Sequence, residues 1–479
     1  MTRLRRATLG LVPETVMRPA PRDAIGTGIV HFGPGAFHRA HQAAYIDTLL
    51  DTDPRWGIAA VSLRSRGTID TLAVQDGLYT LAIRDAAPSY RIIDAHRRFL
   101  GPQDARATMA LLADPAVALV TMTVTEKGYC LAADGTLDLD HPDIVADRRG
   151  DADPCSVIGW IVAGLARRHA AGIAPYVVMP CDNLADNGGK LHRALVAFAA
   201  SSDPVLADWI DRTVRVPGTM VDSITPASDE PLYDDVAGVL GLEDRGAVQR
   251  EALAQWVIED VGDIGPDLAA AGATLTTDVA GYERAKLRML NGAHSTLAYA
   301  GLLRGHDSVA AAMRDPALAD FVEAMIRREI IPTVGIVPGL DLDRYADDVL
   351  ARFRNPAIVH RLDQIAQDGS QKLPYRLGDT LAAQRAAGVM PHRVVAALGC
   401  WAAFVLARLH AGTPVIDPAA ATLAAAADGA TPADFVVALA RQDCGLSRTM
   451  LDDSDLIDAL RRAADAAASG QWGVLGIGS

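Results

Sequence analysis

The first half of the chain alternates short apolar runs with segments of helical spacing. Four runs are almost continuously apolar, as expected of strands covered on both faces: residues 28–32, 57–63, 118–124 and 176–179. Apolar residues at helical spacing predict helices over residues 36–50, 157–169 and 189–200. Residues 77–83 and 90–93 flank an Ala-Pro-Ser turn and predict a hairpin. Strands that alternate with helices indicate a mainly parallel sheet.

The second half is rich in Ala, Leu, Arg and Asp at helical spacing, with Pro and Gly between the segments. It predicts helices over residues 283–303, 308–314, 317–331, 345–354, 377–387, 392–410, 431–441 and 454–468. The Ala-rich residues 419–430 predict a loop with a short helix. We therefore expect an α/β protein with two domains. Residues 1–280 form a Rossmann-type dinucleotide-binding domain with extra strands, and residues 281–479 form a mostly α-helical domain for substrate and catalysis.

Composition narrows the classes of protein. The 479 residues carry a net charge of −14, which opposes a nucleic-acid partner. No continuous apolar run approaches the ~18 residues that span a bilayer, and the N-terminus lacks the pattern of a secretory signal. The five cysteines form no CxxC pair, so neither a disulfide framework nor a zinc site is expected. We expect a cytoplasmic protein without membrane contact.

A Gly-x-Gly turn follows the first predicted strand and precedes a helix. Glycines in this position let the backbone approach a pyrophosphate, although His38 stands where the third glycine of the usual motif would be. The alternative is a tight turn without a ligand. The candidate cofactor-binding residues are Phe32, Gly33, Gly35, Ala36, Phe37 and Arg64. Arg64 and Arg66 follow the second strand in place of an acid, which allows a 2′-phosphate and hence NADP; alternatively, both are solvated.

The segment ERAKLRMLNGAHSTL (283–297) places four polar residues on one helix face together with leucines. At about 100° per residue, Glu283, His294 and Asn291 lie about 60°, 80° and 140° from Lys286. A partly buried Lys has a lowered pKa and can act as a general base. The alternative is a structural Lys–Glu pair with His and Asn in core hydrogen bonds.

Two further polar positions are candidates. Asn183 follows the predicted strand 176–179, at the end where open parallel sheets bind ligands, and it can donate to a developing alkoxide. An Asx turn explains it equally well. Asp222 is a lone acid in the apolar run MVDSITP (220–226) and is equally ambiguous.

Seven stretches of the chain together resemble the polyol-specific long-chain dehydrogenases, which include mannitol 2-dehydrogenases, arabinitol dehydrogenases and D-mannonate oxidoreductases (fructuronate reductases). They are GIVHFGPGAFHRAHQ (28–42), QDGLYT (75–80), TVTEKGY (123–129), CDNLADNG (181–188), MVDSITP (220–226), GYERAKLRMLNGAHS (281–295) and DGSQKLPYR (368–376). The stretches are spread over most of the chain, from residue 28 to residue 376, and the Lys-x4-Asn-x2-His helix is the most specific of them.

The resemblance implies a dehydrogenase that oxidises the C2 hydroxyl of a sugar acid or polyol. Lys286 would be the general base, and Asn183 and Asn291 would hold the oxyanion. His294 would orient the substrate, and Glu283 would lie on a proton path to solvent. The resemblance also implies that Asp222 is near the substrate hydroxyls, that no metal is needed, that NAD is the cofactor with NADP possible, and that the protein is a monomer.

Substrate choice depends on the stretch 368–376. It resembles the mannonate/fructuronate branch more than the mannitol branch, in which an Arg tends to stand where this chain has Gln364. Lys372 and Arg376 could bind a C1 carboxylate; alternatively, Arg376 makes a structural ion pair and Lys372 contacts hydroxyls. The other hypotheses are a mannitol or arabinitol 2-dehydrogenase, a non-catalytic nucleotide sensor, and a decarboxylating dehydrogenase.

Overall fold

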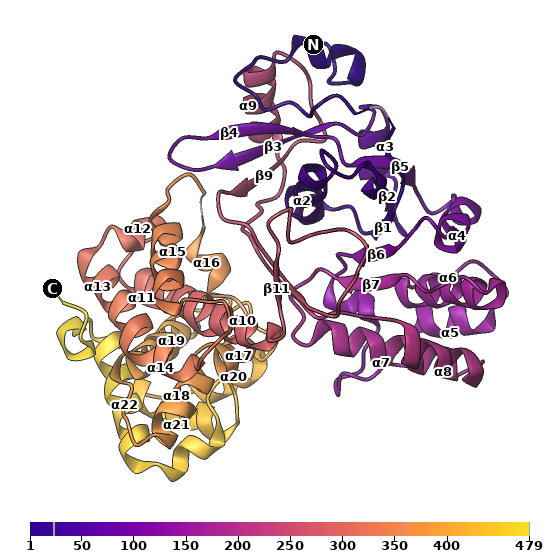
Figure 1. Cartoon of the computed structure of the whole chain (residues 1–479). Coiled ribbons are helices and arrows are strands. Elements are labelled where there is room, and N and C mark those ends of the chain that lie inside the picture. Colours follow the sequence, from indigo (N-terminus) through magenta and orange to yellow (C-terminus); the bar gives the residue numbers. More distant parts are fainter. Residues whose placement is uncertain (23, 359, 479) are drawn as a thin grey trace. The chain divides into compact units, whose positions relative to one another are not determined.

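The computed structural model describes residues 1–22, 24–358 and 360–478. The chain forms two compact units, Met1–Ala280 and Gly281–Ser479. The first unit contains all the strands of the described residues, and the second is helical (Figure 1). This confirms the predicted fold class, a Rossmann-type α/β part followed by a mostly α-helical part.

The first unit is built on a five-stranded parallel sheet in the order β5-β2-β1-β6-β7. Its strands are β1 (Ile29–Phe32), β2 (Ile58–Val61), β5 (His96–Leu100), β6 (Leu119–Met122) and β7 (Val177–Pro180). Counted along the chain, this order is 3-2-1-4-5, that of a Rossmann fold. The sequence predicted β1, β2, β6 and β7 but missed β5, whose HRRFL has little apolar character.

Successive residues of the central strands enter two separate hydrophobic cores. On one face Val30, Val61 and Val120 pack with helices α4 to α8; on the other Ile29 and Ile58 pack with α2. The helices of this unit are α1 (Ala36–Ala40), α2 (Gln42–Leu49), α3 (Gly67–Ala73), α4 (Ala105–Ala113), α5 (Pro142–Arg149), α6 (Val157–Ala171), α7 (Asn187–Ala200), α8 (Pro204–Thr213) and α9 (Glu230–Leu240). Because both faces are covered, the strands are almost continuously apolar.

Two three-stranded sheets complete the first unit. One has the order β4-β3-β9, with β3 (Tyr79–Arg84) and β4 (Ser89–Ile93) forming the predicted antiparallel hairpin beside β9 (Val248–Glu251). The other has the order β11-β10-β8, with β8 (Thr219–Asp222), β10 (Gln255–Glu259) and β11 (Thr274–Thr276). These are the extra strands that the sequence predicted only in part.

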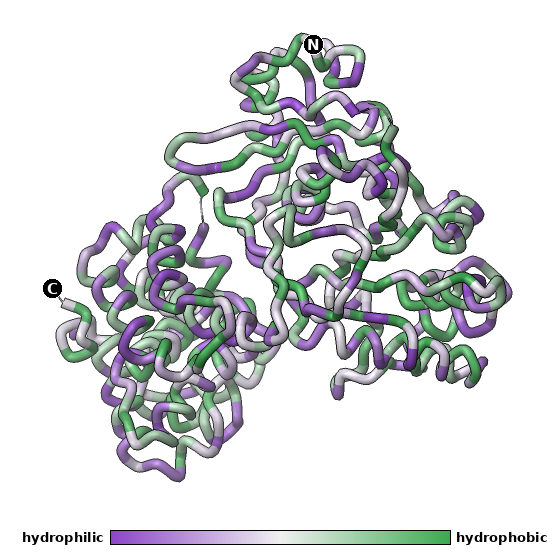
Figure 2. Tube along the Cα trace, in the orientation of Figure 1, coloured by the Kyte–Doolittle hydropathy of each residue, from purple (hydrophilic) through white to green (hydrophobic). Residues whose placement is uncertain are grey.

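The second unit is a stack of helices whose sequence alternates between hydrophilic and hydrophobic stretches (Figure 2). Its α-helices are α10 (Val279–Ala285), α11 (Gly292–Leu303), α12 (Val309–Met313), α13 (Pro316–Met325), α14 (Ile331–Val334), α15 (Leu342–Arg354), α16 (Leu362–Ile365), α17 (Gly369–Leu373), α18 (Asp379–Ala386), α19 (His392–His410), α20 (Ala420–Ala427), α21 (Pro432–Arg441) and α22 (Ser454–Ala468). The predicted helices 392–410 and 454–468 coincide with α19 and α22.

Helix α19 is the core helix of this unit. By length and composition it is the one helix in the described part of the chain that could cross a membrane, although the sequence contains no continuous apolar run of that length. However, 67% of its apolar window is buried inside the protein, and it packs against α11, α21 and α22. Burial against neighbouring helices accounts for its apolar sequence.

Three segments of the second unit are π-helical: η4 (Lys286–Asn291), η5 (Ile326–Ile330) and η6 (Pro374–Gly378). The sequence predicted uninterrupted α-helices over 283–303 and 317–331, and both are interrupted by such a segment. A π turn hydrogen-bonds residue i to i+5 and accommodates one residue more than an α turn. Helical angles that assume a constant 100° per residue are therefore wrong across η4.

Candidate active site

The glycine turn after β1 is fixed by its neighbours in the sheet. Gly33 has a φ of +89°, and a Cβ atom there would overlap the carbonyl oxygen of Thr123. Its N–H donates to the carbonyl of Val61 at 3.0 Å, and its own carbonyl accepts from the Thr123 hydroxyl at 2.6 Å. Position 33 therefore requires glycine. A Cβ on Gly35 would meet only the carbonyl oxygen of Gly33, at 4.0 Å, so this side of the turn is open.

Three buried histidines support this turn from the core. The ring of His31 stacks on that of His38 with centroids 3.4 Å apart, and Nε2 of His38 lies 3.1 Å from Nε2 of His96. His31 also contacts the hydroxyl of Thr121 at 2.7 Å and the carbonyl of Gly33 at 3.2 Å. Burial lowers the pKa of His31 and of His96 to about 3. The cluster is therefore neutral, and it links the turn to β5 and β6.

A cavity of about 640 Å³ lies at the C-terminal ends of β1, β2 and β6; we call it the α5 pocket. Phe32 and Gly33 line it from β1 and the turn, and Arg64 lines it from the segment after β2. Its remaining lining comes from the segment after β6 and from the first residues of α5 and α6. The C-terminal edge of a parallel sheet is where Rossmann-type folds bind ligands.

An ion pair lies in the α5 pocket. The guanidinium of Arg64 is 2.8 Å from the carboxylate of Asp143, the second residue of α5. Arg66, the other arginine after β2, instead pairs with Asp70 at 2.8 Å and with Asp104 at 3.1 Å. Of the two arginines that suggested a phosphate site, only Arg64 lines the pocket.

Two cysteine thiols in the α5 pocket lie in a negative environment. The pKa of Cys130 is raised to about 11, mainly by burial and then by the carboxylates of Asp143 and Asp147. The pKa of Cys155 is raised by burial and by the same two carboxylates. Arg64 lowers the pKa of both thiols, but its effect is smaller than the combined effect of burial and the two carboxylates.

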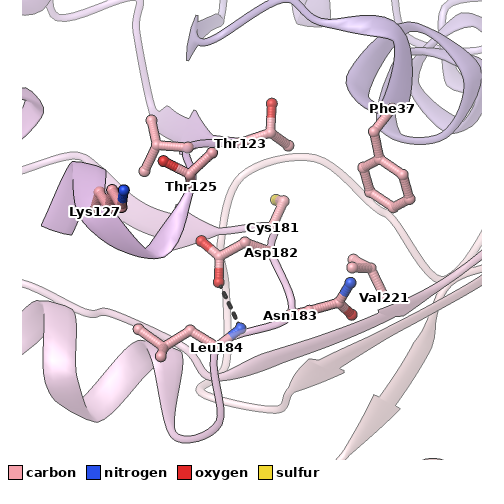
Figure 3. Close-up of a pocket in the computed structure, with 10 residues that line it drawn as sticks. Phe37, Thr123, Thr125, Lys127, Cys181, Asp182, Asn183, Leu184 and Val221 are labelled. Atoms are coloured by element: carbon pink, nitrogen blue, oxygen red, sulfur yellow. Dashed lines mark hydrogen bonds between the residues drawn. The ribbon is translucent and has the colours of Figure 1, made fainter. Parts of the chain in front are cut away.

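A second cavity, of about 680 Å³, lies beside the C-terminal end of β7; we call it the β7 pocket (Figure 3). Phe37, Thr123, Asn183 and Val221 are among its lining residues. The neighbouring carboxylate of Asp182 accepts from the N–H of Leu184 at 3.1 Å and from the hydroxyl of Tyr129. The loop after β7 is thereby held in a defined conformation around Asn183.

The two pockets are neighbours that share part of their lining. Val124, Thr125 and Lys127, which follow β6, line both of them. Together the two pockets line the edge of the sheet from Arg64 to Asn183.

In the second unit, the predicted polar helix is half-buried and contains the π segment η4. Lys286 is its first residue and Asn291 its last, while Glu283 lies in α10 and His294 in α11. The extra residue in the π turn removes about 100° from the rotation between Lys286 and His294, which changes the expected 80° to about 20°. The two side chains are thus closer to one line along the helix than the sequence predicted.

Aromatic rings pack around His294. Its centroid is 4.5 Å from that of Phe353 and 5.6 Å from that of His360. Burial, with a smaller contribution from Arg352, lowers the pKa of His360 to about 4. His360 is therefore a neutral neighbour of His294 at physiological pH.

Both candidate carboxylate-binding residues lie in the second unit and have partners there. Nη1 of Arg376 donates to the hydroxyl of Ser295 at 3.1 Å, while its buried Nε has no hydrogen-bond partner among the described residues. The ammonium of Lys372 is 3.2 Å from the carboxylate of Asp368 and donates to the carbonyl of Gln367 at 2.9 Å. Arg376 therefore has unused hydrogen-bonding capacity, whereas Lys372 is already paired.

The structure brings some of the predicted residues together around the pockets and leaves others outside. Phe32, Gly33 and Arg64 line the α5 pocket, and Phe37 and Asn183 line the β7 pocket. The predicted residues of the first unit that line neither pocket are Gly35, Ala36 and Asp222. Asp222 is the last residue of β8 and is buried.

The sequence analysis missed a group of residues at the α5 pocket: Lys127, Cys130, His141 and Asp143. Lys127 could have been found, because it follows β6 at the end where ligands bind. The other three come from loops whose position the sequence does not reveal. Cys130, His141 and Asp143 offer ligand atoms within 4.8 Å of one another, so they are a potential metal-binding group.

The sheet order and the pockets along its C-terminal edge are those of a Rossmann-type dinucleotide-binding protein. Residues 27–269 match the family model of the mannitol dehydrogenase Rossmann domain, and residues 278–458 match that of the mannitol dehydrogenase C-terminal domain. The chain therefore belongs to the mannitol dehydrogenase family of oxidoreductases, as its sequence motifs predicted.

Relatives in this family differ in their named substrates and cofactors. The chain is 42% identical over 374 residues to the D-mannonate oxidoreductase of Escherichia coli, covering 76% of this chain and 77% of that one. It is 38% identical over 380 residues to the polyol:NADP oxidoreductase of Gluconobacter oxydans, covering 77% and 78%. The mannitol 2-dehydrogenase of Pseudomonas fluorescens, solved with NAD and D-mannitol, superimposes with a TM-score of 0.81 at 32% identity over 99% of both chains.

Proposed function

We propose that this protein is a metal-independent secondary-alcohol dehydrogenase that uses NAD(P). It would oxidise the hydroxyl at C2 of a sugar acid (ketose numbering, with the carboxylate at C6), interconverting D-mannonate and D-fructuronate, and Lys286 would be the general base. The observation that carries the proposal is the pair of neighbouring pockets, with a shared lining, at the C-terminal edge of the parallel sheet. One end adjoins the glycine turn and the other adjoins Asn183.

The residues along this edge fit a dinucleotide. The open face of the turn at Gly35 lets a pyrophosphate approach the backbone, and Lys127 supplies a positive charge beside it. Phe32, Gly33 and Arg64 would hold the adenosine half in the α5 pocket, and Phe37 would contact the other half in the β7 pocket. When bound, the nicotinamide ring accepts or donates the hydride.

The catalytic roles are those that the family's motifs imply for the matching residues. Lys286 would remove the proton of the substrate hydroxyl, which requires its neutral form. Asn183 and Asn291 would donate hydrogen bonds to the oxygen as negative charge develops on it. His294 would orient the substrate, Glu283 would pass the proton from Lys286 to solvent, and Asp222 would bind a substrate hydroxyl.

The preference for a sugar acid depends on Arg376. A buried guanidinium with an unused N–H is suited to a carboxylate, because charge-assisted hydrogen bonds are the strong ones. Lys372 would add positive charge, although its pairing with Asp368 reduces its contribution. The second candidate function is a mannitol or arabinitol 2-dehydrogenase, such as one interconverting D-mannitol and D-fructose. It is favoured if Arg376 serves only to bind Ser295.

The test is a steady-state comparison of D-fructuronate, D-fructose, D-mannonate, D-mannitol and D-arabinitol with NAD(H) and NADP(H). We expect kcat/KM to be highest for D-fructuronate and D-mannonate. A preference for the uncharged polyols would instead support the second candidate, and no turnover with any pair would contradict both.

The proposed enzyme works without a metal, as a monomer in the cytoplasm. The potential ligands Cys130, His141 and Asp143 adjoin the α5 pocket and do not line the β7 pocket. A metal bound there would compete with the adenosine half of the cofactor instead of activating the substrate. Dialysis against a chelator should leave the rate unchanged, and inhibition that added metal reverses would contradict this part of the proposal.

A further inference from the structure

The α5 pocket contains an acidic residue, Asp143, that comes from α5 and not from the segment after the second strand. Rossmann-type sites usually place an Asp or Glu after this strand, where it accepts hydrogen bonds from the ribose hydroxyls. Here the residues after β2 are Ser62, Leu63, Arg64, Ser65 and Arg66. Asp143 lines the same pocket from the first turn of α5, more than seventy residues further along the chain.

In the ion pair with Arg64, Asp143 has the less exposed side chain. The Arg64 side chain is 80% exposed, whereas that of Asp143 is 28% exposed. An ion pair with such exposure contributes little free energy, so Arg64 can change position at small cost. The carboxylate stays in the pocket because α5 holds its backbone, with the N–H of Asp143 donating to Nδ1 of the capping residue His141 at 3.2 Å.

Arg64 is the cation paired with this carboxylate. Arg66 lies outside the pocket lining and is engaged by Asp70 and Asp104. Asp147 adds a further negative charge nearby, but its oxygens accept from the N–H groups of Cys155 and Ser156. Asp143 is therefore the carboxylate of the lining that a ligand can reach once Arg64 moves.

We propose that Asp143 binds the adenosine ribose of the cofactor and makes this protein prefer NAD over NADP. Its carboxylate accepts hydrogen bonds from the ribose hydroxyls. It repels a 2′-phosphate directly, and it also neutralises Arg64, the cation in the lining best placed to bind that phosphate. This inference rests on the proposed function, because it takes the α5 pocket as the adenosine end of the dinucleotide site.

The test uses an isosteric substitution that removes only the charge. Full-length wild-type protein and Asp143→Asn are compared in kcat/KM for NAD+ and NADP+ at saturating substrate. The dissociation constants of both cofactors are measured by quenching of tryptophan fluorescence. We expect the wild type to prefer NAD+ and Asp143→Asn to shift the NADP+/NAD+ ratio at least tenfold toward NADP+. Adding Arg64→Ala to Asp143→Asn should remove most of that gain.

Asp70→Asn is the matched control, because it frees an arginine on the same segment but outside the pocket. Its cofactor ratio should stay within twofold of the wild type. A wild type that prefers NADP+, or an Asp143→Asn ratio within twofold of the wild type, would overturn the inference while leaving a dinucleotide-dependent enzyme intact. Failure of the wild type to bind either dinucleotide would instead contradict the proposed function itself.

Discussion

The Nε2 atoms of His38 and His96 lie 3.1 Å apart in the core of the first unit. One nitrogen must donate and the other accept, so at least the accepting ring is neutral. His31 stacks on His38, and burial places the pKa of all three imidazoles below the ordinary value of 6.5. The support of the glycine turn therefore depends on pH.

We expect the first unit to lose stability in mild acid. His31 and His96 have folded pKa values of about 3 and unfolded values near 6.5, so the unfolded chain binds more protons between these limits. Their contribution to the free energy of unfolding is fully present above pH 6.5 and declines as the pH falls toward 3. At pH 5 the loss is about 2 kcal/mol for each histidine. The free energy of unfolding, measured by urea denaturation at pH 7.5 and at pH 5.0, gives this loss.

The variant His96→Gln separates this effect from the titration of carboxylates. Its amide can still exchange a hydrogen bond with His38 but does not titrate. The difference in unfolding free energy between the two pH values should be smaller than in the wild type by about 2 kcal/mol. An unchanged difference would show that His96 is not one of its sources.

Gly33→Ala should disable the nucleotide-binding turn. The φ of +89° and the overlap with Thr123 would cost about 1–3 kcal/mol of stability and would displace the turn. We expect a lower melting temperature and at least tenfold weaker NAD+ binding. Gly67→Ala is the control, because a Cβ there meets nothing within 4 Å; comparable losses in both variants would contradict the assigned role of Gly33.

Lys286→Ala should lower turnover by roughly 10²- to 10⁴-fold, the usual contribution of a general base. In the wild type the oxidation rate should rise with pH as the lysine loses its proton, and this dependence should disappear in the variant. Cofactor binding should be retained. Lys190→Ala, on α7 and outside the lining of both pockets, is the matched control. Near-normal turnover in Lys286→Ala would remove this residue as the base.

Arg376→Gln tests the recognition of a sugar acid. A hydrogen bond to a charged group contributes about 1.5–3 kcal/mol, so kcat/KM for the sugar acid should fall at least tenfold, while that for an uncharged polyol changes less than threefold. Arg361→Gln is the control, since this arginine is 61% exposed and pairs with Asp363. Equal losses for acid and polyol would indicate that Arg376 acts through the fold around Ser295.

The sequence predicted those strands and helices whose apolar pattern lies within the element itself. The central strands were visible because burial on both faces requires apolar runs, and α19 and α22 were found to the residue. Strand β5 was missed because its HRRFL is half polar, and its place is determined by pairing with β2. The π segment at Lys286 was missed because no residue type marks a π turn.

The candidate site was predictable only in part for a similar reason. Gly33 and Asn183 follow strands that the sequence indicates, so their place at one edge of the sheet could be inferred. Asp143 comes from a helix with little apolar periodicity, and it enters the pocket through contacts more than seventy residues apart in sequence. Such long-range contacts leave no local pattern.

The π segment between Lys286 and Asn291 has a consequence for chain length. Deleting one residue between them would allow a regular α-helix, which is the more stable local structure. The helix would be preserved, and seven steps of about 100° would place Lys286 about 20° from His294, the same angle that the π turn gives over eight residues. In this segment the chain can therefore differ in length by one residue without changing the alignment of Lys286 with His294, because the π turn takes up the extra residue.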